Sequence, residues 1–206
     1  MNGSHRPWSY AVALLTLVVA ATWTTHALES AFDAAPAAQS SRAPEPVMPK
    51  YDKNGALLLP EDYRRWVMVG ASLGISYSEM PGEHQMFAHT LMEPTAYRSF
   101  VETGKFREGT MFALLLQGPG DKVLPARRGQ FANDVHGVEM AVKDSSHVPE
   151  GWAYYGFGGM DGIRSSASAQ PRNSCFSCHA EHAARDHVFL QFYPLLTEAA
   201  AASKSR

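Results

Sequence analysis

Both cysteines of the 206-residue chain lie in one short run, Asn173-Ser174-Cys175-Phe176-Ser177-Cys178-His179. With only two thiols so close together, the chain cannot be a disulfide scaffold. The spacing C-x-x-C-H is instead the attachment motif of c-type haem, because the two thiols reach the two vinyl groups of one porphyrin and the next imidazole is placed under the iron. The motif therefore predicts one covalent haem c, attached through Cys175 and Cys178, with His179 as the proximal iron ligand.

Two other uses of a C-x-x-C pair fit the sequence less well. A zinc site would need further ligands, and the chain has no second cysteine pair. A thioredoxin-like redox pair should open a helix after a strand near the start of a fold, whereas this pair closes the predicted domain. The following histidine favours haem over both alternatives.

The first 27 residues have the layout of an export signal. His5 and Arg6 precede an almost wholly apolar run from Trp8 to Trp23, and Thr25-His26-Ala27 offers small residues at the positions that signal peptidase reads. The run has about 16 residues, which is slightly short for a helix that spans a bilayer. We expect a signal peptide over 1–27, with an uncleaved N-terminal anchor as the alternative. In both cases the rest of the chain is expected in the periplasm.

Composition divides the remainder of the chain. Residues 28–50 are rich in Ala, Pro and Ser, which favours a linker, and 199–206 are typical of a fraying tail. The haem domain is expected over 51–198, long enough for one hydrophobic core. The formal net charge is -2 without a basic stripe, so there is no electrostatic case for nucleic-acid binding.

The pattern within the domain predicts an α+β fold, with an antiparallel sheet flanked by short helices. Helices should open at Pro60-Glu61-Asp62 and at Glu93-Pro94, the second ending at Gly104, and a third should carry the haem motif over 175–184. The segment 110–116 is apolar on both faces, as in a buried central strand, and Gly118-Pro119-Gly120 should break it. Further strands are expected at 131–142, 152–157 and 188–192.

Alternation along two of these strands predicts a haem-facing surface on one side of the sheet. It consists of alternate residues from each strand: Thr110, Phe112, Leu114 and Leu116, with Val135, Gly137, Glu139 and Ala141. This face is mostly apolar and has two small residues, so a flat porphyrin could lie there. The alternative is ordinary core, with Glu139 pointing to solvent at a sheet edge. A carboxylate facing the haem would be costly to ionise, so Glu139 should then have a raised pKa or a partner.

Several short motifs follow one another along nearly the whole domain. They are LLLP at 57–60, YRRWVMVG at 63–70, TGKFREGT at 103–110, GVE at 137–139, VKD at 142–144, GWAYY at 151–155, DHVF at 186–189 and FYP at 192–194. In these motifs and in the haem motif the chain resembles cytochrome P-460 and its relatives, the cytochromes c′-beta. The resemblance implies a homodimeric, predominantly β-sheet haem protein, with His179 as proximal ligand and an open distal side.

The chain departs from this family on the distal side. The lysine that crosslinks to the porphyrin in true cytochromes P-460 is matched by Leu114, which cannot form that bond. An arginine of some members is matched by Ala88, whereas the distal acid that acts in proton transfer is matched by Glu139. The resemblance therefore favours the c′-beta type, with Phe112 and Leu114 lining the distal pocket and Glu139 as a distal proton relay.

The group on the far side of the iron decides between classes of function. Methionine sulfur is one candidate sixth ligand, and the chain offers Met80, Met86, Met92, Met111 and Met140. We favour Met86 among them because its segment should lie near the distal side. An open, apolar site favours nitric oxide or carbon monoxide as ligand. The alternative is redox work with a partner protein, as a His/Met electron carrier or as an oxidoreductase acting on hydroxylamine or nitric oxide.

Overall fold

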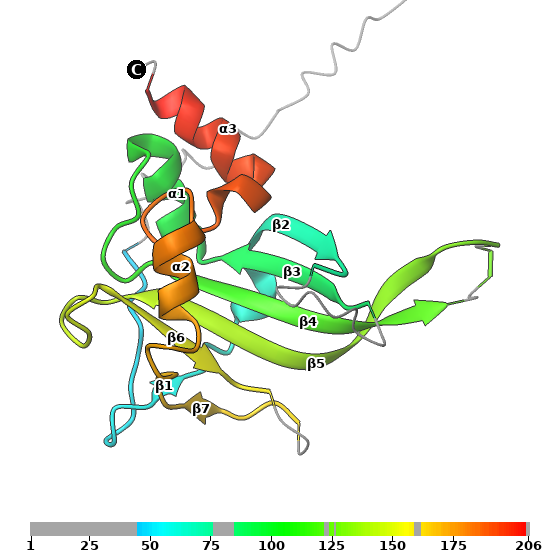
Figure 1. Ribbon diagram of the computed structural model, residues 1–206, viewed down its shortest axis with the longest axis horizontal. Coiled ribbons are helices and arrows are strands. Elements are labelled where there is room, and N and C mark those ends of the chain that lie inside the picture. The colour runs from blue at the N-terminus through cyan, green and yellow to red at the C-terminus, as the bar shows by residue number, and fades with distance from the viewer. Residues whose placement is uncertain (1–44, 76–84, 122–123, 126, 159–161, 205–206) are drawn as a thin grey trace, which may run out of the picture. The chain divides into compact units, whose positions relative to one another are not determined.

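A computed structural model describes residues 45–75, 85–121, 124–125, 127–158 and 162–204 (Figure 1). The predicted signal segment, residues 28–44 of the predicted linker, and Met80 lie outside these ranges. Within them, no helix is long and apolar enough to cross a bilayer.

The centre of the fold is an antiparallel sheet of five strands, in the order β2-β3-β4-β5-β6. The strands are β2 (Val67–Leu73), β3 (Phe87–Met92), β4 (Met111–Asp121), β5 (Gln130–Lys143) and β6 (Trp152–Gly156). A separate pair joins β1 (Leu57–Leu58) to β7 (Ser166–Ala167). The predicted α+β class with an antiparallel sheet is therefore confirmed.

Three short helices lie over one face of the sheet (Figure 1). They are α1 (Pro94–Thr103), α2 (Phe176–His182) and α3 (Pro194–Ser203), and two 3-10 turns accompany them, η1 (Tyr63–Arg65) and η2 (Leu190–Phe192). The predicted ends of α1 are confirmed. Glu93 caps the helix by accepting hydrogen bonds from the amides of Thr95 and Ala96, and Gly104 ends it in the left-handed region with φ 66°.

Alternate residues of β4 and β5 enter two different cores. Met111, Ala113 and Leu115 of β4 pack with Val138 and Met140 of β5 on the face away from the helices. On the other face, Phe112 packs with residues of the three helices and of β6. The sheet is thus buried on both sides, as the doubly apolar pattern of 110–116 predicts.

The structure corrects two local expectations before the haem motif. The helix expected from Pro60 is only the 3-10 turn η1, because Val67 begins β2 and pairs with Met92 of β3. The break expected at Gly118-Pro119-Gly120 is a pair of register irregularities, and β4 continues to Asp121. Pro119 is tolerated because it lies beyond the end of β3, where only β5 pairs with β4.

The chain after the haem motif also differs from expectation. The segment 188–192 is not a strand. Its residues form a turn and η2, and Val188, Phe189 and Leu190 are buried by packing instead of by pairing with another strand. The residues expected to form a tail from 199 continue α3 as far as Ser203, with Ala200 buried.

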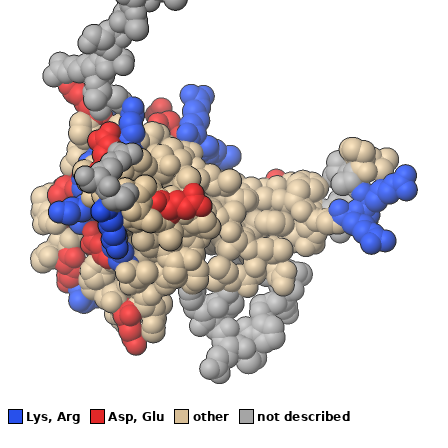
Figure 2. Space-filling model, turned by 90° about the horizontal axis from the view of Figure 1, so that it is seen from above, with Lys and Arg blue, Asp and Glu red and all other residues tan. Residues whose placement is uncertain are grey.

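Beyond the body of the sheet, β4 and β5 extend as a two-stranded ribbon (Figure 1). Figure 2 shows basic side chains at the end of this ribbon, where Arg127 and Arg128 are exposed. Over the wider part of the molecule, side chains of both signs are intermingled in the same view.

Candidate functional site

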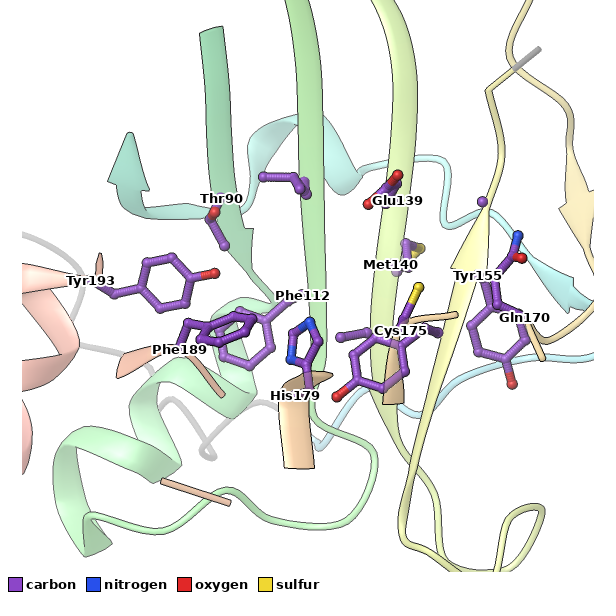
Figure 3. A pocket seen from close by; sticks show the side chains of 14 residues that line it. Thr90, Phe112, Glu139, Met140, Tyr155, Gln170, Cys175, His179, Phe189 and Tyr193 are labelled. Carbon is purple, nitrogen blue, oxygen red and sulfur yellow. The ribbon is translucent and has the colours of Figure 1, made fainter. Parts of the chain in front are cut away.

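A cavity of about 290 Å³ opens between the helix-covered face of the sheet and α2. Phe112 and Glu139 contribute to its wall from the sheet, while Cys175 and His179 approach it from the haem motif (Figure 3). Leu114 of β4 also lines it. The structure therefore brings together five of the seven residues that the sequence nominates for the site.

Strand register explains how these side chains meet. Two rows run across the sheet: Thr90, Leu114, Glu139 and Gly156 form one, and Met92, Phe112, Ala141 and Tyr154 form the other. Antiparallel strands place directly paired residues on the same face, so both rows face the cavity side. The pairing of Leu114 with Glu139 confirms the predicted common face for these two residues. It also excludes the sheet-edge alternative for Glu139, since β5 has a neighbour on each side there. Val135 was expected on the same face, but a register shift after Leu116 pairs it with Gln117, and it packs against the opposite core.

One ring nitrogen of His179 forms a hydrogen bond within the protein. Its Nδ1 donates a hydrogen bond to the backbone carbonyl of His187 over 2.7 Å, and its ring packs between those of Tyr154 and Phe189, each 4.4 Å away between centroids. Because a carbonyl only accepts, this bond fixes the tautomer that leaves a lone pair on Nε2. Burial lowers the pKa of His179, which favours the neutral imidazole that binds metals. His179 is thus prepared to act as a ligand through Nε2.

The two thiols are half-buried and unpaired. Cys175 lines the cavity and precedes α2, whereas Cys178 lies within the helix, one turn further on, and is not among the lining residues. Burial, together with the charges of Glu139 and Cys178, raises the pKa of the Cys175 thiol. Cys175 at the start of α2, and Cys178 and His179 within it, thus lie close together along one short segment, and Cys175 and His179 line the cavity.

Glu139 stands in the cavity wall within reach of water, yet burial in the surrounding protein raises its pKa. This outcome agrees with the expectation that a carboxyl on the haem-facing surface would be difficult to ionise. A carboxyl with a raised pKa can hold a proton at higher pH than an ordinary glutamate, as a proton relay requires.

Three polar residues of this cavity are not predicted by the sequence. Thr90 is 5% exposed and stands beside Leu114, and the hydroxyl of Tyr193 lies on the same side, while Gln170 lies on the side of Glu139 (Figure 3). The cavity is therefore more polar than the sequence led us to expect. Recognition of 87–92 as the partner of β4 would have identified Thr90, because antiparallel pairing then places it opposite Leu114.

The methionines occupy other positions. Met86 precedes β3 and is not among the residues that line the cavity. Met140 lies in the wall, but its side chain belongs to the opposite core, together with Met111. Among the described residues, no methionine side chain points from the sheet into the cavity beside Leu114.

The order of the short motifs along the domain is that of a known protein family. A profile of the cytochrome P-460 family matches residues 60–190, more than half of the chain. The chain belongs to the cytochrome P-460 family. It is accordingly a haem-binding cytochrome. A search of curated proteins finds none that matches it.

The residues at the cavity fit the haem of a cytochrome P-460 protein. The donor set is a neutral imidazole with a free Nε2, next to two thiols with the c-type spacing. The wall opposite supplies the flat, largely apolar surface of Phe112, Leu114 and Ala141. When bound, haem supplies an iron centre for redox chemistry or for binding small ligands.

Proposed function

We propose that this member of the cytochrome P-460 family is an exported monohaem cytochrome of the c′-beta type that binds nitric oxide or carbon monoxide. One haem c would be attached through Cys175 and Cys178 and held by His179. The opposite side of the iron would face the sheet and remain open. In this proposal the protein acts in the periplasm as a homodimer.

The observation that supports this proposal most strongly is Leu114 in the sheet wall of the cavity that His179 also lines. Leucine offers no nucleophile for a crosslink to the porphyrin and no ligand for the iron. The nearest polar neighbours in its row are Thr90 and Glu139, neither of which is a strong iron ligand of the kind found in electron carriers. An iron held only by His179 would therefore be accessible to small diatomic molecules.

Glu139 gives the same cavity a group that can exchange protons. General acid–base catalysis contributes about 10²–10⁴-fold to a rate, which cannot replace the electronic effect of a missing porphyrin crosslink. We therefore expect little or no hydroxylamine oxidation, although Glu139 matches the distal acid of enzymes in the family.

Two measurements test the proposal. The ferrous protein should have the absorption spectrum of five-coordinate haem and should bind nitric oxide and carbon monoxide. Mass spectrometry of the haem peptide should show two thioether bonds only. A six-coordinate ferrous spectrum with slow or absent gas binding would favour a His/Met electron carrier instead. A third covalent bond to the porphyrin, or sustained hydroxylamine turnover, would make the protein an oxidoreductase.

A further inference from the structure

The turn that presents the His187 carbonyl to His179 has an unusual backbone. Arg185 and Val188 close it with reciprocal backbone hydrogen bonds, and the two residues between them, Asp186 and His187, have φ of 45° and 58°. Positive φ is uncommon for residues other than glycine and persists where the surroundings hold it in place. Asp and His tolerate this region better than most residues, and contacts from outside the turn would hold them there more firmly.

The carboxylate of Asp186 makes such contacts. Lys143 donates from Nζ to Oδ2 over 2.6 Å, and Trp152 donates from Nε1 to Oδ1 over 3.1 Å. We call these three residues the Asp186 clamp. Lys143 ends β5 and Trp152 begins β6, and the two are directly paired across the strands, so the clamp anchors the turn to a fixed end of the sheet.

The clamp is firmly placed. Trp152 is 2% exposed, and the Lys143 side chain, which is 18% exposed, also donates to the carbonyl of Phe106 over 3.1 Å. The Asp186 side chain is 34% exposed, but its carboxylate also accepts from the buried Trp152 indole, which orders the ion pair better than an isolated surface pair. A displaced Asp186 would carry the adjacent His187 carbonyl with it.

We propose that the Asp186 clamp positions the proximal ligand of the haem. By fixing the His187 carbonyl, it keeps the hydrogen bond from His179 Nδ1 short and aligned, which sets the ring orientation and raises the basicity of the imidazole. Lys143, Trp152 and Asp186 are positioning residues in this role. The inference rests on the proposed function, in which His179 is the iron ligand.

A clamp that only stabilises the turn would affect stability, whereas a positioning clamp also changes the bond between His179 and the iron. Two variants separate these roles. Asp186→Asn removes the ion pair but retains an oxygen that can accept from Trp152. Asparagine also tolerates the positive φ at this position. Lys143→Met removes the cation and leaves the turn sequence intact. Glu150→Gln is the matched control, because it breaks an exposed ion pair, with Arg172, that includes no residue of the clamp.

The experiment compares these holoproteins with the wild type by resonance Raman spectroscopy of the ferrous state and by redox titration. Both clamp variants should retain their haem. Their iron–histidine stretching frequency should be lower, because a less basic imidazole binds the iron less strongly. Their reduction potential should be higher, because such an imidazole stabilises ferric iron less. Lys143→Arg, which keeps a cationic donor, should restore both values towards those of the wild type. The control should match the wild type.

The outcomes also separate this inference from the proposed function. A wild type without an iron–histidine band would overturn both. A normal wild-type band that is unchanged in the clamp variants would overturn the positioning role alone, even if the melting temperature falls. If Asp186→Asn does not accumulate as a folded protein, Lys143→Met and Lys143→Arg decide the question by the same two measurements.

Discussion

The two faces of the central sheet are built from the same strands but packed in opposite ways. On one face, Met111, Ala113 and Val138 are almost completely buried in a hydrophobic core. On the other face, Leu114 and Glu139 border a cavity of about 290 Å³. Strand pairing is equally regular for both sets of side chains, so the difference comes from what covers each face.

The fold is less tightly packed on the face that carries the candidate site. A cavity among apolar side chains lowers stability, because the groups that line it lose contacts. The chain tolerates that loss beside His179 and Cys175 and avoids it on the closed face. Haem would fill the open face in the holoprotein, so the closed face should carry the stability of the fold and the open face its chemistry.

The largest expected effect is loss of the group that fills the open face. The double variant Cys175→Ala with Cys178→Ala should contain no covalent haem, because both thioether bonds are removed. Denaturing electrophoresis with haem staining checks this, since the wild type should keep its haem on the gel. Haem that acidic acetone extracts intact from the wild type would contradict covalent attachment.

A matched pair of truncations sharpens the comparison of the two faces. Met140→Ala leaves a new cavity in the closed core and should lower the free energy of unfolding by about 2–5 kcal/mol. Leu114 lies in the neighbouring strand, next to the Ala113 that pairs with Met140, but its side chain is on the open face. Leu114→Ala enlarges a cavity that already exists, so it should lower the free energy of unfolding by about 1 kcal/mol or less. Chemical denaturation of both variants measures the difference. Equal losses would contradict the division between the faces.

The sequence predicts this division where alternation is strong. The apolar segment 110–116 and the glutamate in 131–142 are enough to place Leu114 and Glu139 on one face, and the capping residues Glu93 and Gly104 fix the limits of α1. These features are local, so they can be recognised without knowledge of the tertiary structure.

The sequence does not predict the features that depend on distant partners. Val67 lies in a segment that resembles a helix face, yet pairing with Met92 makes it a strand residue. The apolar run after Asp186 resembles a strand, but it has no strand partner and closes over the haem motif as a turn. The clamp joins Lys143, Trp152 and Asp186 across 43 residues of sequence. Each lies in one of the short motifs noted above, but nothing local to a motif shows that the three side chains meet.

The open face should also make stability depend on pH. Burial raises the pKa of Glu139 above its ordinary value of about 4.5, so the folded state binds this proton more tightly than the unfolded chain does. The resulting stabilisation is present below that ordinary value and is lost as the pH rises through the raised pKa. Glu139→Gln cannot ionise, so it should gain in melting temperature relative to the wild type as the pH rises from 4 to about 8.

A control for this titration is available at the surface. Glu150→Gln also replaces an acid by its amide, but Glu150 is paired with Arg172 outside the cavity. Its melting temperature should show no gain over the wild type across the same pH range. If Glu139→Gln behaves in the same way as this control, burial on the open face does not raise the pKa of the Glu139 carboxyl.

The smallest expected change in stability concerns Thr90, the buried hydroxyl beside Leu114. Thr90→Val keeps the shape of the side chain and should change the free energy of unfolding by about 1 kcal/mol or less, the net contribution of a typical hydrogen bond. Its effect should appear in ligand preference, because donors near the open side of haem stabilise bound dioxygen more than carbon monoxide. The ratio of dioxygen to carbon monoxide affinity should therefore fall.

Thr110→Val is the matched control for that measurement. Thr110 is fully buried, but its hydroxyl donates to the carbonyl of Arg107 outside the cavity. The substitution should cost more stability than Thr90→Val, because it removes a hydrogen bond made within the fold. It should leave the ratio of gas affinities unchanged. If both variants change that ratio equally, the polar row across the open face does not select the ligand, and the preference must arise elsewhere in the cavity.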